Sequence, residues 1–267
     1  MARVLTLDDV DLDGRTVLVR IDINSPIDPV TNVFLDDTRI RLVLPTLNLL
    51  SKSKVVIMAH QSRPGKKDFT STLGHARELG RLLGRNVKWV DDIYGKKALT
   101  AIESMENGDL LMLNNVRMDE EEVGVKGDFV TLSDTRIVQN LSLVADAFVN
   151  DAFACSHRSS PSIVGFTNVL PCIAGELMNH ELSKLGQALE NPNRPCIAVL
   201  GGVKVDDSII VADNMLRGDV CDHVWVTGGV ANLFLYLSGI DLGEVNINFL
   251  KNELGDTWDQ TIVTASK

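Results

Sequence analysis

Short apolar runs rich in β-branched residues alternate along this chain with longer segments of helical periodicity, and this alternation constrains the fold more than any other feature. The predicted strands are 17–23, 54–59, 87–90, 110–113, 143–148, 197–200 and 223–226. The predicted helices are 38–50, 72–83, 96–105, 134–141, 205–216 and 230–237. Pro45 should kink or break the first helix. Strands that alternate with helices of this length are typical of βαβ units, so we expect an α/β fold with mainly parallel sheets.

A polar, proline-rich segment divides the chain. Residues 190–195, with Pro192 and Pro195, follow a helical stretch at 175–189, and strand–helix alternation continues on both sides. We therefore predict a first domain at residues 1–172, an interdomain helix and hinge at 173–194, and a second domain at 195–267. After Gly239 no strong strand follows, and about 75 residues are few for an independent α/β domain. The second domain is therefore expected to be incomplete.

The overall charge limits what the chain can bind. Its 267 residues carry a net charge of −10, and 45% of them are hydrophobic, as in an ordinary globular protein. This acidic balance argues against a general nucleic-acid surface but leaves room for a local basic cleft. Residues 1–13 lack the apolar segment of a signal peptide, and no run of about 18 apolar residues occurs. We therefore expect a cytoplasmic protein with no membrane span.

The cysteines give no sign of a disulfide framework or a metal site. Cys155, Cys172, Cys196 and Cys221 are scattered, without a C-x-x-C pair or a metal-ligand spacing. We expect reduced, mostly buried thiols and no structural metal. The sequence shows neither a Ser-His-Asp order nor a glycosidase pair of carboxylates, so it does not indicate a hydrolase.

Arginines recur at or near the ends of apolar segments, at Arg39, Arg63, Arg117 and Arg158. His60 lies shortly before Arg63, and His157 lies directly before Arg158. Open α/β sheets bind ligands at the carboxyl ends of their strands, and arginine grips carboxylate or phosphate oxygens bidentately. We therefore predict one shared site for a phosphorylated or polycarboxylate ligand, although each arginine alone could be an ordinary surface residue.

The first predicted strand carries polar side chains toward its carboxyl end. Strand alternation places Asp22 and Asn24 on one face together with Arg20, while the apolar residues face the other way. Asp22 and Asn24 should thus project together where ligands bind. A solvated strand end before a turn at Pro26 is the alternative interpretation.

Two acidic segments are interpreted as structural. Asp36 and Asp37 stand where the helix at 38–50 needs an N-cap and first-turn anions. Arg39, in that first turn, is unfavourable with the helix dipole, which favours a ligand role for it. The acidic run at 119–122 is expected to be a solvated loop.

Glycine-rich turns follow both predicted strands of the second domain. Gly201-Gly202-Val203-Lys204 comes after the strand at 197–200, and Gly228-Gly229 comes after the strand at 223–226. Paired glycines let backbone N–H groups at a helix N-terminus approach a phosphate, and Lys204 adds a positive charge. Neither a Walker A sequence nor G-x-G-x-x-G occurs, so a plain strand–helix turn is the alternative.

Taken in order, these segments resemble the phosphoglycerate kinase family. The matching segments are 20–26, 37–40, 60–64, 115–117, 151–158, 200–205 and 228–229. Each motif alone is moderately specific, but their common order along the chain is highly specific. The segment Asp206-Asp207-Ser208 is similar to the archaeal branch of that family.

The resemblance implies two Rossmann-like parallel-sheet domains joined by a helix, with the acid substrate on the first and the nucleotide on the second. It implies that 3-phosphoglycerate is bound by Asp22, Asn24, Arg39, His60, Arg63, Arg117 and Arg158. Arg39 would also stabilise the transferring phosphoryl group, and Lys204 would share in catalysis. Gly201, Gly202 and Lys204 would meet the nucleotide phosphates, with Gly228 and Gly229 near the adenosine.

The implied reaction is the glycolytic exchange in which 1,3-bisphosphoglycerate and ADP give 3-phosphoglycerate and ATP, with Mg²⁺ accompanying the nucleotide. Such phosphoryl transfer depends on positioning and fixed positive charge, so hinge closure that excludes water is expected. The alternative is a non-catalytic phospho-ligand binding module that keeps only the first domain. A dehydrogenase is disfavoured because the dinucleotide fingerprint is missing.

The chain departs from the family pattern at several positions. Val203 replaces the usual alanine before Lys204, Ser208 stands where many members carry a second lysine, and Gln61-Ser62 replaces the common Leu-Gly. The later strands of the family and most of its magnesium–nucleotide site are not found before Lys267. We therefore expect a truncated, poorly active chain. The sequence does not indicate the oligomeric state.

Overall fold

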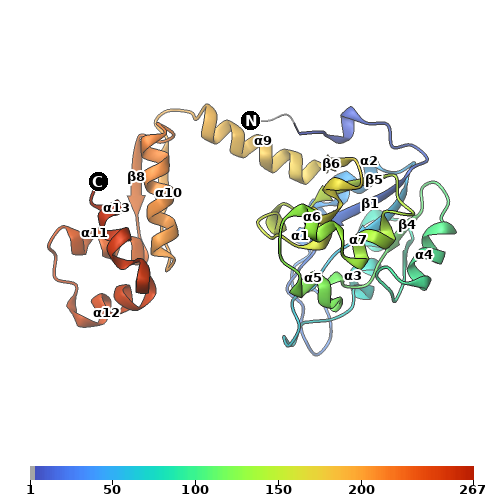
Figure 1. The fold of residues 1–267 in the computed structure, drawn as a ribbon, viewed down its shortest axis with the longest axis horizontal. Coiled ribbons are helices and arrows are strands. Elements are labelled where there is room, and N and C mark those ends of the chain that lie inside the picture. Colours follow the sequence, from blue (N-terminus) through green and yellow to red (C-terminus); the bar gives the residue numbers. More distant parts are fainter. Residues whose placement is uncertain (1–3) are drawn as a thin grey trace. The chain divides into compact units, whose positions relative to one another are not determined.

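The structure is a computed structural model that describes residues 4–267. It separates into two compact units, which divide between Leu182 and Ser183 (Figure 1). The division falls inside the long helix α9 (Glu176–Glu190), so this helix belongs in part to each unit. Each unit has its own sheet and its own buried apolar core.

A parallel sheet forms the centre of unit 1, residues 1–182. Its strands in the described part of the unit are β1 (Thr16–Ile21), β2 (Lys54–Met58), β3 (Val87–Trp89), β4 (Leu110–Met112), β5 (Ala147–Asp151) and β6 (Cys172–Ala174). They lie in the order β3-β4-β2-β1-β5-β6, and all neighbouring pairs are parallel. Parallel neighbours need crossover connections, which is why helical segments separate these strands along the chain.

Mostly short helices make these connections. They are α1 (Thr38–Leu42), α2 (Leu44–Leu49), α3 (Leu73–Leu83), α4 (Lys96–Glu103), α5 (Glu120–Gly124), α6 (Phe129–Ser133), α7 (Arg136–Leu141) and α8 (Pro161–Val164). Short 3₁₀ helices occur at Leu7–Asp9, Val116–Met118, Phe153–Cys155 and Gly165–Asn168. Two of them, Val116–Met118 and Phe153–Cys155, come within a few residues of the carboxyl ends of β4 and β5.

Strand β1 shows that the sheet is covered on both faces. Val19 packs with Leu47 and Leu79 in the core on one face, while Leu18 packs with Phe148 in the core on the other. All five of these side chains are 1% exposed or less. Parallel sheets are usually buried on both faces, and the period-2 alternation predicted for this strand is confirmed.

The first predicted helix is interrupted, as Pro45 led us to expect. α1 ends at Leu42 and α2 begins at Leu44, with Pro45 in the first turn of α2. Proline lacks a backbone N–H, so it is accommodated in a first helical turn but not in a helix interior. The break makes α1 a separate short helix, and this helix carries Arg39.

Some elements differ from the prediction. The strand predicted at 143–148 is β5 at Ala147–Asp151, and Leu143 is 81% exposed in the loop before it. β6 (Cys172–Ala174) was not predicted. In unit 2, helix α12 (Gly243–Leu254) was not predicted either, since its apolar residues are interspersed with asparagine and glutamate.

The prediction of a solvated loop at 119–122 is wrong. Glu120–Gly124 forms α5, and Asp119 and Glu122 are buried, at 7% and 5% exposed. The Tyr94 hydroxyl donates a hydrogen bond to Asp119, and Glu122 accepts two from Ser162. These long-range partners compensate the burial of Glu122 and of one Asp119 oxygen, and a local sequence pattern cannot reveal them.

Unit 2, residues 183–267, has a two-stranded parallel sheet in the described chain. β7 (Ile197–Leu200) pairs with β8 (His223–Val226). Its helices are α10 (Val205–Arg217), α11 (Gly228–Leu237), α12 and α13 (Trp258–Ala265), with a short 3₁₀ helix at Gly255–Thr257. Val205, Val230 and Leu250 lie in its core. Both units are thus α/β with parallel strands, which confirms the predicted fold class.

Among the described residues, no helix is both long enough and apolar enough to cross a membrane. All four cysteines lie in the described part of the chain and are free thiols. Cys155 and Cys221 are buried, and Cys172 and Cys196 are partly exposed. The cysteines are therefore less uniformly buried than predicted.

Truncation of Phe148 should destabilise unit 1 strongly. Phe148 is 1% exposed and stacks on Phe166 with ring centroids 5.0 Å apart, so Phe148→Ala should reduce the free energy of unfolding by about 3–5 kcal/mol. Leu143→Ala is the matched control, because the exposed Leu143 side chain should contribute less than about 0.5 kcal/mol. Equilibrium urea unfolding measures both values, and equal losses would contradict the assigned start of β5.

Candidate anion-binding site

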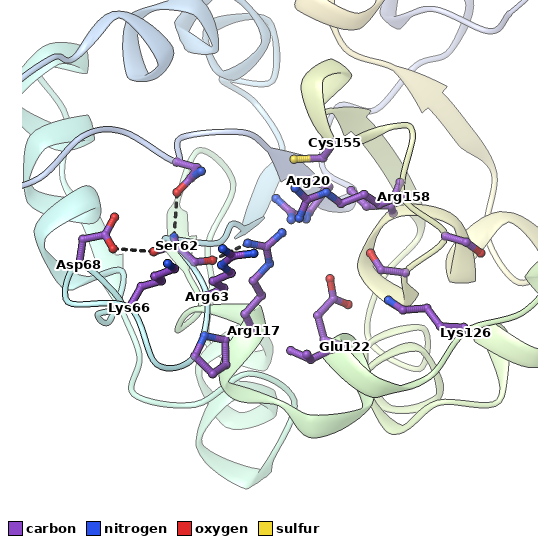
Figure 2. Close-up of a pocket in the computed structure, with 16 residues that line it drawn as sticks. Arg20, Ser62, Arg63, Lys66, Asp68, Arg117, Glu122, Lys126, Cys155 and Arg158 are labelled. Carbon is purple, nitrogen blue, oxygen red and sulfur yellow. Dashed lines mark hydrogen bonds between the residues drawn. The ribbon is translucent and has the colours of Figure 1, made fainter. Parts of the chain in front are cut away.

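A pocket of about 730 Å³ opens at the carboxyl edge of the unit 1 sheet (Figure 2). Asn24 follows β1, Arg63 follows β2, Arg117 follows β4 and Arg158 follows β5. These strands are parallel neighbours, so their carboxyl ends necessarily meet at one edge. The sheet topology therefore brings together four of the residues that the sequence singled out.

The lining of this pocket is predominantly cationic. The positively charged residues are Arg20, Arg63, Lys66, Arg117, Lys126 and Arg158, and Figure 2 shows them around the cavity. Only Asp68 and Glu122 contribute carboxylates among the described lining residues. A concave site lined mainly by one sign of charge concentrates the field, so the pocket attracts anions although the chain as a whole is acidic.

Asp22 holds Arg39 at this edge of the sheet. Asp22 is 5% exposed, and its carboxylate is ion-paired with the Arg39 guanidinium from α1. The other carboxylate oxygen accepts the backbone N–H of Asn24 at 3.0 Å. This ion pair fixes one guanidinium nitrogen of Arg39 and leaves the rest of the side chain partly exposed. Because the side chain is already held in place, a ligand that binds it removes less side-chain entropy.

His60 is buried beside the arginines and remains neutral. Its Nδ1 lies 3.0 Å from Nη2 of Arg20, and because a guanidinium only donates, Nδ1 accepts and the ring proton sits on Nε2. Burial lowers the pKa of His60 to about 2, and the nearby charges of Arg20, Arg158 and Arg39 act in the same direction. His60 thus presents a neutral donor, and a charged imidazolium would be opposed by its neighbours.

Ser62 organises the loop after β2 around an unusual backbone conformation. Its φ is 57°, in the left-handed region, and its N–H donates to Asn24 Oδ1 at 2.8 Å. Its carbonyl oxygen accepts from the Arg117 guanidinium, and its hydroxyl donates to Asp68 at 2.7 Å (Figure 2). One residue therefore ties together two predicted ligand residues, Asn24 and Arg117.

The sequence interpretation omitted two buried charged residues of this pocket, Arg20 and Glu122. Arg20 is 2% exposed, and its guanidinium donates to Ser162, to the Ile21 carbonyl and to His60. The alternation of β1 had put Arg20 on the same face as Asp22, so a signal for it was present. Glu122 had no comparable signal, because the run of glutamates has no apolar periodicity.

Asp22, His60 and Cys155 offer ligand atoms within 4.8 Å of one another, a geometry that could hold a metal ion. Their atoms are already engaged, however, since Asp22 pairs with Arg39 and His60 accepts from Arg20. Burial raises the pKa of the Cys155 thiol to about 11, so it is protonated at neutral pH. With these guanidinium groups alongside, the local charge favours an anion over a cation.

In unit 2 the two glycine-rich turns pack against each other. The N–H of Gly229 donates to the Gly202 carbonyl at 3.0 Å, and a Cβ on Gly228 would lie 3.2 Å from the Gly202 nitrogen. Gly202 and Gly228 have φ values of 112° and 60°, which a residue with a side chain rarely adopts. The turns at the ends of β7 and β8 therefore need glycine for both conformation and space.

Lys204 is the last residue of the first turn, Gly201-Gly202-Val203-Lys204. It occupies the N-cap position of α10. Its side chain is 75% exposed and lies 3.4 Å from Glu253 of α12. Ser208, one turn further, donates its backbone N–H at 3.3 Å and its hydroxyl at 2.8 Å to the Lys204 carbonyl, so its side chain adds to a helical hydrogen bond and brings no cation. Lys204 belongs to unit 2 and Arg39 to unit 1.

His60 should stay neutral from pH 8 down to pH 5. Since its pKa is lowered to about 2 by burial and by the neighbouring arginines, its Cε1–H chemical shift should not move over that range in a proton–carbon NMR titration. An unperturbed histidine titrates near about 6.5. His60→Gln assigns the signal, and a midpoint between pH 6 and 7 would contradict the buried, neutral ring.

Comparison with known proteins identifies relatives over almost the whole chain. A family model described as phosphoglycerate kinase matches residues 7–266. The chain is 50% identical over 250 residues to a phosphoglycerate kinase of Methanobacterium bryantii, a match that covers 93% of this chain and 61% of the relative. It is also 50% identical over 249 residues to one of Methanothermobacter thermautotrophicus, covering 92% and 60% of the two chains.

Solved structures agree with these relatives. The crystal structure of phosphoglycerate kinase from Pyrococcus horikoshii OT3 matches with a TM-score of 0.87 and 39% identity, over 98% of this chain and 65% of that chain. The chain thus spans about three fifths of the length of the curated relatives that it matches. Because the family model covers nearly every residue, the chain belongs to the phosphoglycerate kinase family.

Proposed function

We propose that the cationic pocket of unit 1 binds 3-phosphoglycerate, the acid substrate of this family. The observation that carries the proposal is the convergence of Arg63, Arg117 and Arg158 with the Asp22–Arg39 pair at one sheet edge. A small acid with a phosphate at one end and a carboxylate at the other needs several fixed donors. Arginine serves both groups, since its planar fork grips two oxygens at once.

Asp22, Asn24 and His60 supply the groups that orient the ligand. Asp22 and His60 are both buried, and their contacts with Asn24, Arg39 and Arg20 hold each side chain in position. A carboxylate among the arginines can accept from a hydroxyl group of the substrate, and the neutral imidazole can donate to an oxygen. Arg39, half exposed and ion-paired with Asp22, is suited to the phosphoryl group in transfer, where charge spreads over the equatorial oxygens.

Unit 2 is proposed to bind the nucleotide. The packed turns at Gly201-Gly202 and Gly228-Gly229 present backbone groups at the starts of α10 and α11, and Lys204 adds a positive charge. Such donors fit phosphate oxygens and not a cation. Asp206 and Asp207 in the first turn of α10 are carboxylates of the kind that Mg²⁺ takes, so the ion could enter with the nucleotide and be held partly there.

Together these sites support phosphoryl transfer between ATP and the carboxylate of 3-phosphoglycerate as the function of the protein, with 1,3-bisphosphoglycerate and ADP on the other side of the equilibrium. The protein would act in glycolysis, in the cytoplasm. Little covalent chemistry is asked of the protein in this reaction, and fixed positive charge and positioning do most of the work. The arginines of unit 1 and Lys204 of unit 2 provide such fixed positive charge.

Arginine substitutions test the acid-substrate site. Arg39→Ala and Arg117→Ala should each weaken 3-phosphoglycerate binding by about tenfold or more, because each loses a charge-assisted contact worth at least about 1.4 kcal/mol. Arg41→Ala is the matched control: Arg41 lies on α1 beside Arg39 but pairs with Asp37 outside the pocket. Isothermal titration calorimetry gives the affinities. Equal losses in all three variants, or no binding by the unmodified chain at millimolar ligand, would refute the assignment.

The nucleotide site is tested separately with MgADP. Lys204→Ala should weaken MgADP binding about five- to tenfold, because a phosphate loses one cationic contact. Lys251→Ala on α12 is the control, since Lys251 lies outside the two glycine turns. Fluorescence titration measures both variants, and binding that is insensitive to Lys204 would count against the proposed phosphate site.

A further inference from the structure

A buried carboxylate on the wall of the anion pocket needs an explanation. Glu122, on α5, is 5% exposed and lines the pocket together with Arg20, Arg117 and Arg158. Figure 2 shows its carboxyl group extending into the cavity. A negative charge there opposes an anionic ligand, and burial of a carboxylate is itself unfavourable. Its presence is explained if the charge acts on another residue of the site.

The contacts of Glu122 lead to Arg20 through a single serine. Ser162 is fully buried; its backbone N–H donates to Glu122 Oε2 at 2.9 Å and its hydroxyl donates to Oε1 at 2.7 Å. Since the hydroxyl proton is used on Glu122, the Ser162 oxygen is free to accept, and Arg20 Nε donates to it at 2.9 Å. Carboxylate, hydroxyl and guanidinium thus form one continuous chain of hydrogen bonds.

The remaining partners of Arg20 cannot replace this chain. Its other two nitrogens donate to the Ile21 carbonyl and to His60, which are both neutral groups. No carboxylate among the described residues lies within ion-pair distance of Arg20. Burial raises the pKa of Glu122, while the charge of Arg20 acts in the opposite direction and favours the carboxylate. Glu122 is therefore the acidic group that compensates the buried guanidinium.

We infer that Glu122 is a positioning residue, which fixes the Arg20 guanidinium in the anion pocket by way of the Ser162 hydroxyl. Arg20 can then present its charge to a phosphorylated acid without leaving its buried position. The identity of that ligand as 3-phosphoglycerate rests on the proposed function, but the hydrogen-bonded chain does not.

A purely structural role makes a different prediction. If Glu122 only anchored α8, its bond to the Ser162 backbone N–H would suffice, and the hydroxyl would be dispensable. Ser162→Ala keeps that backbone bond and deletes only the bridge to Arg20. This substitution therefore separates positioning from anchoring.

The test measures 3-phosphoglycerate affinity by calorimetry in the full 267-residue chain. Ser162→Ala and Glu122→Ala should each weaken binding about tenfold, and the double variant should lose no more than either one, because both act through one chain of bonds. Glu122→Gln removes the charge and leaves one acceptor oxygen for the two Ser162 donors, so it should also weaken binding, by about three- to tenfold. Glu120→Ala, an exposed residue of the same helix, is the control and should leave the affinity unchanged.

A spectroscopic signal reports on Arg20 directly. The Nε–Hε cross-peak of Arg20 should be visible and protected from exchange in the unmodified chain, and it should shift and lose protection in Ser162→Ala. If that cross-peak and the affinity are both unchanged in folded Ser162→Ala protein, the inference is overturned. Should the unmodified chain fail to bind 3-phosphoglycerate, the ligand assignment falls, and the cross-peak still decides whether Glu122 positions Arg20.

Discussion

The parallel pairing of β1 with β2 and β5 is the constraint on which the site depends. Parallel strands run in one direction, so the segments that follow them leave the sheet at the same edge. Residues far apart in sequence, such as Asn24 and Arg158, thereby line one pocket. A segment that followed an antiparallel strand would instead leave the sheet at the opposite edge.

The second requirement is to keep many cations close together without a ligand. Unit 1 meets it by giving several of them a partner. Asp22 pairs with Arg39, the Ser62 carbonyl accepts from Arg117, and Arg20 is linked to Glu122 through Ser162. Most of these partners are buried or backbone groups, so they do not move away when a ligand arrives. The pocket is therefore largely organised before binding, which lowers the entropy that binding must remove.

Local sequence patterns predicted the regular elements well where a strong period was present. β7 and β8 have the predicted limits, and the alternation along β1 correctly separated Val19 from Arg20 and Asp22. Prediction failed where the pattern was short or misleading. The apolar residues around Leu143 precede β5 without belonging to it, and the acidic run containing Glu122 forms a helix that is partly buried.

The sequence by itself determined the fold class and the positions of the strand-end arginines, because both follow from periodicity and from residue type. Only the tertiary structure decided which of those side chains share a pocket, and which partners hold them. Ser162 and Glu122 lie 40 positions apart, and Arg20 lies 142 positions from Ser162. Such contacts depend on how the strands are ordered in the sheet and on which segments pack at its carboxyl edge. Periodicity along the chain carries no information about either.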